Sequence, residues 1–148
     1  MESVRASRWS AVVVILLAGI WGLDVHEQGL AATGQDLLLS DGVYSDTQAS
    51  RGARVYRRIC ASCHAGELDG SEMGPALSGA EFLGGWDGEV LAELMSLISN
   101  TMPAEDPGGL DQGEYTDVLS FILRANGFPP GDELTIDAMA EILIGELG

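Results

Sequence analysis

Five consecutive residues constrain this 148-residue chain more than any other stretch. Residues 60–64 read Cys-Ala-Ser-Cys-His, so two cysteines stand two residues apart and a histidine follows at once. On one helical turn Cys60 and Cys63 share a face, from which both thiols can reach the two vinyl groups of one porphyrin. His64 can then present its imidazole to the iron from the proximal side. The spacing is typical of covalent haem attachment, in which the sulfurs become thioethers and do not ligate the metal.

Two other kinds of site use paired cysteines at this spacing. Structural zinc needs four ligands, whereas the chain has two Cys and two His, and His26 lies in a segment that export would remove. A thiol redox motif accompanies a strand-and-helix pattern, whereas residues 48–59 have the apolar spacing of a helix. Haem attachment is therefore favoured, with thiol or zinc chemistry as the alternative.

The N-terminal part, residues 1–31, has the three-part layout of a secretory signal peptide. Arg5 and Arg8 give a basic start, residues 9–23 form an apolar run, and small residues follow at 29–32. The run is shorter than the roughly 20 residues that a spanning helix needs. We expect an exported, periplasmic protein, with an uncleaved membrane anchor as the alternative.

The charge is strongly acidic. Without residues 1–31 the chain has 5 basic and 20 acidic groups, a net charge of −15, and it contains no lysine. We therefore do not expect nucleic acid or anionic lipid as partners, because both are negatively charged. The acidity indicates either a redox partner with a basic docking face, because opposite fields speed encounter, or an adaptation for solubility or salt.

Helical periodicity dominates the remainder, and we expect an all-α domain with no β-sheet. Residues 32–44 are weakly patterned and are interpreted as an exposed linker. Four helices are expected. The first runs from a capping box at Ser45 to about Cys63, and the second follows a cap at Asp87. The third runs from a capping box at Asp111 to about residue 126, and the fourth covers about residues 135–147.

Gly52 interrupts the first expected helix and should cost it about 1 kcal/mol relative to Ala. A close helix crossing would explain it, and the apolar face of residues 115–122 is the expected partner. Four of the five mature basic residues lie on this helix, namely Arg51, Arg54, Arg57 and Arg58. They form either a solvated face paired with acids or a contact to a haem propionate.

The loop after His64 contains Gly-Pro-Ala-Leu at residues 74–77. A proximal histidine needs an acceptor for its Nδ1–H, and the carbonyl of Pro75 is the candidate; an ordinary loop proline is the alternative. Leu77 and several residues of the apolar stripe at 90–98 are expected to line the haem. Trp86 has a donor N–H that could bind a propionate.

Met102 is the candidate for the second axial ligand. It lies between Thr101 and Pro103 on an expected loop, beyond a helix, where it can approach the opposite haem face. A thioether ligand raises the reduction potential of haem iron. Methionines usually fill cores, and the competitors lie in the leader, the proximal loop or helical patterns, namely Met1, Met73, Met95 and Met139.

Together these motifs resemble the class I c-type cytochromes, over about residues 45–127. The matching residues are Arg-Gly and Tyr in the first helix, the haem motif, Gly-Pro-x-Leu, Thr-Met-Pro and the helix from Tyr115. The resemblance implies a small all-α fold of four to five helices around one covalent haem c. It also implies His64 and Met102 as iron ligands, crossing terminal helices and one-electron shuttling. Residues 128–148 would form an extension whose helix packs on the domain.

A narrower similarity is to cytochromes that serve quinoprotein dehydrogenases, through residues 101–129. It implies a carrier between an exported dehydrogenase and a downstream acceptor, such as an oxidase or another cytochrome. The alternative is a haem enzyme or a gas or peroxide sensor with a labile sixth ligand. Docking through a ring of lysines is not implied, because the chain has none.

Overall fold

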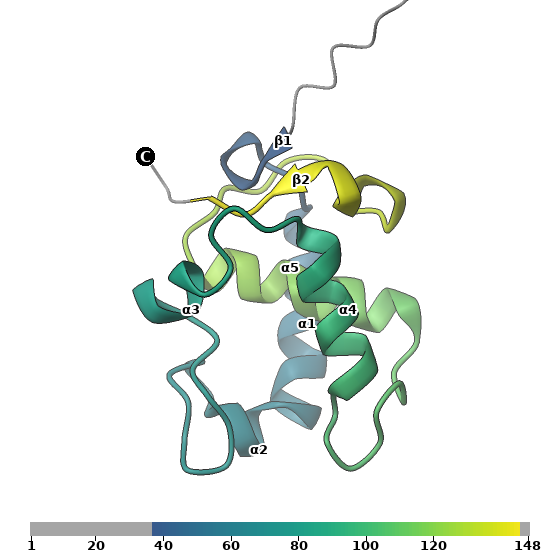
Figure 1. Cartoon of the computed structure of the whole chain (residues 1–148). Helices are drawn as coiled ribbons and strands as arrows, with labels where there is room; N and C mark the ends of the chain where they lie inside the picture. The colour runs from purple at the N-terminus through teal and green to yellow at the C-terminus, as the bar shows by residue number, and fades with distance from the viewer. Residues whose placement is uncertain (1–36, 146–148) are drawn as a thin grey trace, which may run out of the picture. The chain divides into compact units, whose positions relative to one another are not determined.

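The computed structural model describes residues 37–145, which form a mostly helical domain, as expected for a small cytochrome c fold (Figure 1). The predicted signal segment and the residue Leu147 lie outside the described residues. The elements in chain order are β1 (Leu37–Leu38), the 3₁₀ turn η1 (Leu39–Asp41), α1 (Asp46–Ile59), α2 (Ala61–His64), α3 (Ala80–Gly84), α4 (Leu91–Thr101), α5 (Gln112–Ala125), the 3₁₀ turn η2 (Asp137–Glu141) and β2 (Ile142–Leu143). Within residues 37–145 no helix is long and apolar enough to cross a membrane.

Helices α1 and α5 begin where the capping boxes predict. The Ser45 side chain accepts from the N–H of Gln48, and Asp111 accepts from the N–H of Glu114 at 2.8 Å. The predicted end of α1 at Cys63 is wrong, because α1 stops at Ile59 and α2 starts separately. The break falls at Cys60, whose backbone departs from ideal helical angles while still closing a bond to the helix.

Helices α1 and α5 cross at Gly52. A Cβ atom there would lie 1.8 Å from the carbonyl oxygen of Asp117, so any larger residue would force the two backbones apart. Arg51, the preceding residue, binds the carboxylate of Asp117 at 2.6 and 2.7 Å. Arg58 binds Glu114 at 2.9 Å. Two of the four arginines of α1 therefore pair with acids of α5.

Helix α4 does not start at the predicted Asp87 cap. Its N-cap is Val90, which gives no side-chain hydrogen bond. The reason is the C-terminal segment, because Ile144 binds the backbone of Gly88 and of Glu89 at 2.7 and 2.8 Å. Val90 also forms a bridge with Leu143. These contacts hold residues 88–90 out of the helix and delay its start.

Part of the expected linker, namely Leu39 and residues 42–44, is packed rather than exposed, whereas Leu37 and Leu38 stay exposed. Leu39, Val43 and Tyr44 are buried. The Tyr44 hydroxyl donates to the carbonyl of Phe128 at 2.5 Å, and the carbonyl of Tyr44 accepts from Gly131 N–H at 2.7 Å. The expectation of exposure is therefore wrong for Leu39 and residues 42–44, because partners far along the chain cover them.

The predicted C-terminal helix over residues 135–147 is also wrong. The chain forms η2 and then β2, which pairs in parallel with β1, Leu37 opposite Ile142 and Leu38 opposite Leu143. This small sheet overturns the expectation of no β-structure. A segment of few residues gains little from helix formation alone, and pairing with β1 supplies its backbone partners instead.

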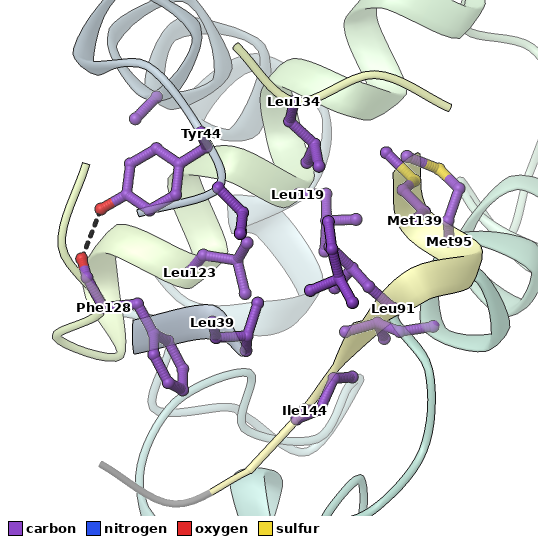
Figure 2. Packing of buried hydrophobic residues seen from close by; sticks show 14 of the residues in the cluster. Leu39, Tyr44, Leu91, Met95, Leu119, Leu123, Phe128, Leu134, Met139 and Ile144 are labelled. Atoms are coloured by element: carbon purple, nitrogen blue, oxygen red, sulfur yellow. Dashed lines mark hydrogen bonds between the residues drawn. The ribbon is translucent and has the colours of Figure 1, made fainter. Parts of the chain in front are cut away.

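The buried side chains form two clusters. The larger, which we call the terminal cluster, joins α4 and α5 to both ends of the described chain (Figure 2). Its buried members are Leu39, Val43, Tyr44, Ala49, Leu91, Leu94, Met95, Tyr115, Leu119, Leu123, Phe128, Leu134, Met139, Ile142 and Ile144. The smaller, which we call the cavity cluster, consists of Val55, Tyr56, Leu68, Val118 and Ile122.

Candidate functional site

A cavity of about 650 Å³ opens beside the cavity cluster. Its walls come from α1, α2, the loop 69–77, α3, α4 with the turn that follows it, and α5. All seven residues that the sequence singles out line this one cavity, namely Cys60, Cys63, His64, Pro75, Leu77, Trp86 and Met102. Sites this large and mainly apolar bind cofactors and other small molecules.

The two cysteines lie one helical turn apart on the cavity wall. The N–H groups of Cys63 and His64 both bind the carbonyl of Cys60, at 3.1 and 3.0 Å. Both sulfurs are free and partly buried. Burial raises the pKa of the Cys60 thiol to about 11, and the neighbouring Cys63 adds to the rise. Before haem is attached, Cys60 in the folded chain would therefore be a protonated thiol at neutral pH.

His64 is buried, with 7% of its surface exposed. Its Nδ1 lies 2.8 Å from the carbonyl oxygen of Pro75, the acceptor expected from the sequence. With the proton on Nδ1, that atom donates to the carbonyl, and Nε2 is left with a free lone pair. Such a bond fixes both the tautomer and the ring orientation of a metal-binding histidine.

The loop around His64 is tied down by further contacts that the sequence did not reveal. The Tyr56 hydroxyl donates to the carbonyls of His64 and Ala65, at 3.2 and 2.7 Å. The Ser71 hydroxyl donates to the carbonyl of Cys63 at 2.5 Å. A Cβ atom at Gly74 would lie 3.0 Å from two ring atoms of His64. Gly74 thus allows the loop to lie against the imidazole.

Met102 lies at the C-terminal end of α4, on a different wall of the cavity from His64. Its N–H binds the carbonyl of Ile98 at 2.9 Å, and its carbonyl accepts from the Tyr115 hydroxyl at 2.6 Å. Met73 also lines the cavity, on the loop beside His64, and 70% of it is exposed. Of the competing methionines, Met95 and Met139 are core residues of the terminal cluster.

The remaining walls are largely apolar, as expected for the stripe of α4. Leu94, Leu97 and Ile98 face the cavity together with Phe82 and Trp86. Leu97 has half of its surface exposed, although most leucines at the centre of a helix face are buried. An apolar group seated in the cavity would cover it.

The charged residues on the cavity wall are acids. Asp69, Glu81 and Glu105 line it, and none of the arginines within residues 37–145 does. The described residues therefore give no support to a contact between an arginine of α1 and a haem propionate. Neutral donors such as the Trp86 N–H are the groups available to a carboxylate there.

The donor set fits a covalently attached haem. Two thiols one turn apart, an oriented histidine, a thioether on another wall and apolar sides all converge on one cavity. The fit does not extend to zinc, because within residues 37–145 no group of three or more His, Cys, Asp or Glu side chains could hold a metal ion.

The comparisons agree with this assignment. Residues 47–122 match the model of the family described as cytochrome c oxidase, cbb3-type, subunit III. The match covers just over half of the chain, so the protein belongs to this family of c-type cytochrome domains, which bind haem c covalently and transfer electrons. Among curated proteins, no sequence matches.

One solved structure supports the same fold. The crystal structure of the sulfane dehydrogenase SoxCD from Paracoccus pantotrophus matches with a TM-score of 0.52 and 20% identity. The match covers 74% of this chain and 61% of that chain, so the protein spans less than two thirds of the neighbour's length. At this identity the likeness concerns the fold.

Proposed function

We propose that the protein is an extracytoplasmic one-electron carrier whose haem iron is ligated by His64 and Met102. The observation that carries the proposal is the convergence of these two side chains on one cavity from separate elements, each with its backbone held by hydrogen bonds. With both axial positions filled, the iron offers no open site for a substrate, and electron transfer is the remaining chemistry.

In this proposal each residue has a physical task. Cys60 and Cys63 attach the porphyrin, Pro75 orients His64, and the apolar residues of α4 exclude water. Bound haem supplies a one-electron couple between ferric and ferrous iron. If His64 and Met102 hold the iron in both oxidation states, little reorganisation would accompany the change of charge.

The ligand assignment is tested with the ferric absorption spectrum. We expect a sulfur–iron charge-transfer band that disappears in Met102→Ala. Met73→Ala is the matched control, because it removes another cavity methionine and should leave the band in place. High-spin ferric haem in the unaltered protein would contradict the proposal and favour a haem enzyme or a gas or peroxide sensor.

Covalent attachment is tested by denaturing the protein in acid and extracting it with organic solvent. The unaltered chain should keep its haem, whereas Cys60→Ser or Cys63→Ser should lose one thioether link and mature poorly. Haem released from the unaltered chain would favour the thiol or zinc alternative.

For partners, we propose a donor or acceptor with a basic docking face, such as a quinoprotein dehydrogenase, an oxidase or another cytochrome. Three acids on the cavity wall support this choice, namely Asp69, Glu81 and Glu105, because no arginine within residues 37–145 lines the cavity beside them. The fold neighbour is a sulfane dehydrogenase, which adds dehydrogenases to the donors worth assaying. Electron transfer to a cationic partner should slow as salt rises, because mobile ions screen the attraction. A flat salt profile would favour solubility as the reason for the acidity.

A further inference from the structure

Two tyrosines on the crossing helices make similar contacts to the candidate iron ligands. Tyr56 of α1 donates its hydroxyl hydrogen bond to the carbonyls of His64 and Ala65. Tyr115 of α5 donates to the carbonyl of Met102 at 2.6 Å. Each helix therefore holds the backbone of one of the two residues proposed to ligate the iron.

The Tyr115 contact acts on a segment that has left its helix. Met102 follows the last residue of α4 and has an extended backbone, with φ −123° and ψ 149°. Residues 104–109 are exposed, and the segment turns locally through bonds from Asp106 N–H to Pro103 and from Gly109 N–H to Asp106. Tyr115 connects this segment to the body of the domain, because its bond spans from the turn to α5.

The position of Tyr115 is itself well fixed. Only 4% of the residue is exposed, and its ring belongs to the terminal cluster. It lies in the first turn of α5, directly after the capping box of Asp111 and Glu114. Two residues further along, at Asp117, α5 meets α1 at Gly52. The hydroxyl thus belongs to a rigid part of the fold.

We propose that Tyr115 is a positioning residue for Met102. Its hydroxyl holds the Met102 carbonyl, which keeps the thioether on the cavity wall and slows its departure from the iron. The inference rests on the proposed ligation by Met102, and it concerns the lifetime of that ligation rather than its identity.

The test is displacement of the methionine by imidazole in the ferric holoprotein. The iron–sulfur bond breaks and an iron–nitrogen bond forms, and neither step changes the oxidation state. Tyr115→Phe keeps the ring and removes one hydrogen bond, so imidazole should bind roughly two- to tenfold more tightly. At saturating imidazole the displacement rate, which reports sulfur departure, should rise by a similar factor.

Tyr44→Phe is the matched control. Tyr44 is also buried, and it donates to a backbone carbonyl, that of Phe128 at 2.5 Å, but Phe128 does not line the cavity, whereas Met102 does. Both variants should lose stability to denaturant, and only Tyr115→Phe should change imidazole binding. Asp111→Ala, which loosens the first turn of α5 while keeping Tyr115, should increase imidazole binding as well and serves if Tyr115→Phe folds poorly.

The outcomes separate this inference from the proposed function. If the unaltered ferric protein lacks the sulfur–iron band, the ligation by Met102 fails, and the role of Tyr115 fails with it. If the band is present but Tyr115→Phe and Asp111→Ala bind imidazole as the unaltered protein does, the positioning role alone is overturned. An equal increase in Tyr44→Phe would also overturn it, because the effect would then follow general destabilisation.

Discussion

The terminal cluster and the cavity cluster are completed in different ways. The terminal cluster closes with side chains of the polypeptide alone, because residues 39–44 and 128–144 cover the helices (Figure 2). The cavity cluster has five buried members and borders a cavity of about 650 Å³, beside which Leu97 and Met73 stay exposed. One region is stabilised by the sequence itself, and the other needs the haem to fill it.

This contrast between the two clusters indicates where haem contributes stability. Burial of apolar surface gives about 25 cal/mol per Å², and on the cavity side that burial depends on a bound porphyrin. Because α1 and α5 contribute to both clusters, the two regions are still coupled through the helix crossing. Changes to the crossing should therefore affect both, and changes elsewhere should affect one.

The largest effect is expected from Gly52→Ala. The added Cβ would lie 1.8 Å from a backbone carbonyl, so α1 and α5 must separate and both clusters loosen. We expect a loss of about 3 kcal/mol or more in the free energy of unfolding, measured with denaturant. Gly66→Ala is the control, since nothing lies within 4 Å of its Cβ. Equal stability of the two variants would show that the crossing tolerates a side chain.

Removal of haem should separate the two regions. In the haem-free chain with Cys60→Ser and Cys63→Ser, the bond from Leu77 N–H to Leu68 should lose protection from hydrogen exchange. The bond from Asp132 N–H to Gly42, beside the terminal cluster, should keep more of it. Hydrogen exchange followed by mass spectrometry measures both. Equal exchange in the two segments would contradict the comparison.

Met139→Ala should destabilise the terminal cluster without altering the haem. The residue is 1% exposed, and truncating a buried methionine costs about 2–5 kcal/mol. The ferric spectrum should not change. Met73→Ala, at an exposed position, should change stability by no more than about 0.5 kcal/mol. A shifted haem spectrum in Met139→Ala would show closer coupling than the two clusters suggest.

Gly74→Ala should alter the haem site with little effect on the stability of the terminal cluster. The added Cβ would lie 3.0 Å from His64 Nδ1 and Cε1, which disturbs the bond to Pro75 with little effect on the core. We expect a change in reduction potential on the order of 20–60 mV, up to about a tenfold change in the one-electron equilibrium. Voltammetry measures it, with Gly84→Ala as a control in open space. An unchanged potential would mean that the ring tolerates the methyl group.

The smallest effect is expected from Tyr44→Phe, at about 1 kcal/mol near pH 7. Burial raises the pKa of Tyr44 above its ordinary value of 10, although Arg124 opposes the rise and Asp46 adds to it. The folded protein then keeps a proton that the unfolded chain releases, so this contribution is present below pH 10 and declines as pH rises beyond it. Denaturant unfolding between pH 9 and 11 should show a smaller decline in Tyr44→Phe. Identical slopes would contradict the shift.

Local signals in the sequence predicted much of the helical domain. The capping boxes at Ser45 and Asp111 placed the starts of α1 and α5, because side chains within three residues satisfy the first N–H groups. Gly52 predicted a close crossing from the cost of a glycine within a helix. Pro75 was found because the distance in sequence to His64 is short and only a carbonyl is needed.

Apart from the end of α1, the errors involve partners far apart in the chain. No local pattern reveals that Leu37 pairs with Ile142, or that Ile144 holds residues 88–90 out of a helix. For the same reason the buried lead-in was interpreted as a linker. Ser71 and Tyr115 were missed as site residues, since a loop serine and a helical tyrosine carry no signal until their hydroxyl partners are known.

The last residues of the terminal cluster lie near the end of the described chain, and they are therefore synthesised late. Residue Ile144 is made 81 residues after Cys63, which at about 5–20 residues per second takes several seconds. Throughout that time the terminal cluster lacks its last members, so the part of the core that the polypeptide closes by itself stays incomplete. The residues that line the cavity, the last of which is Ile122, are therefore all synthesised before the segment that completes the terminal cluster.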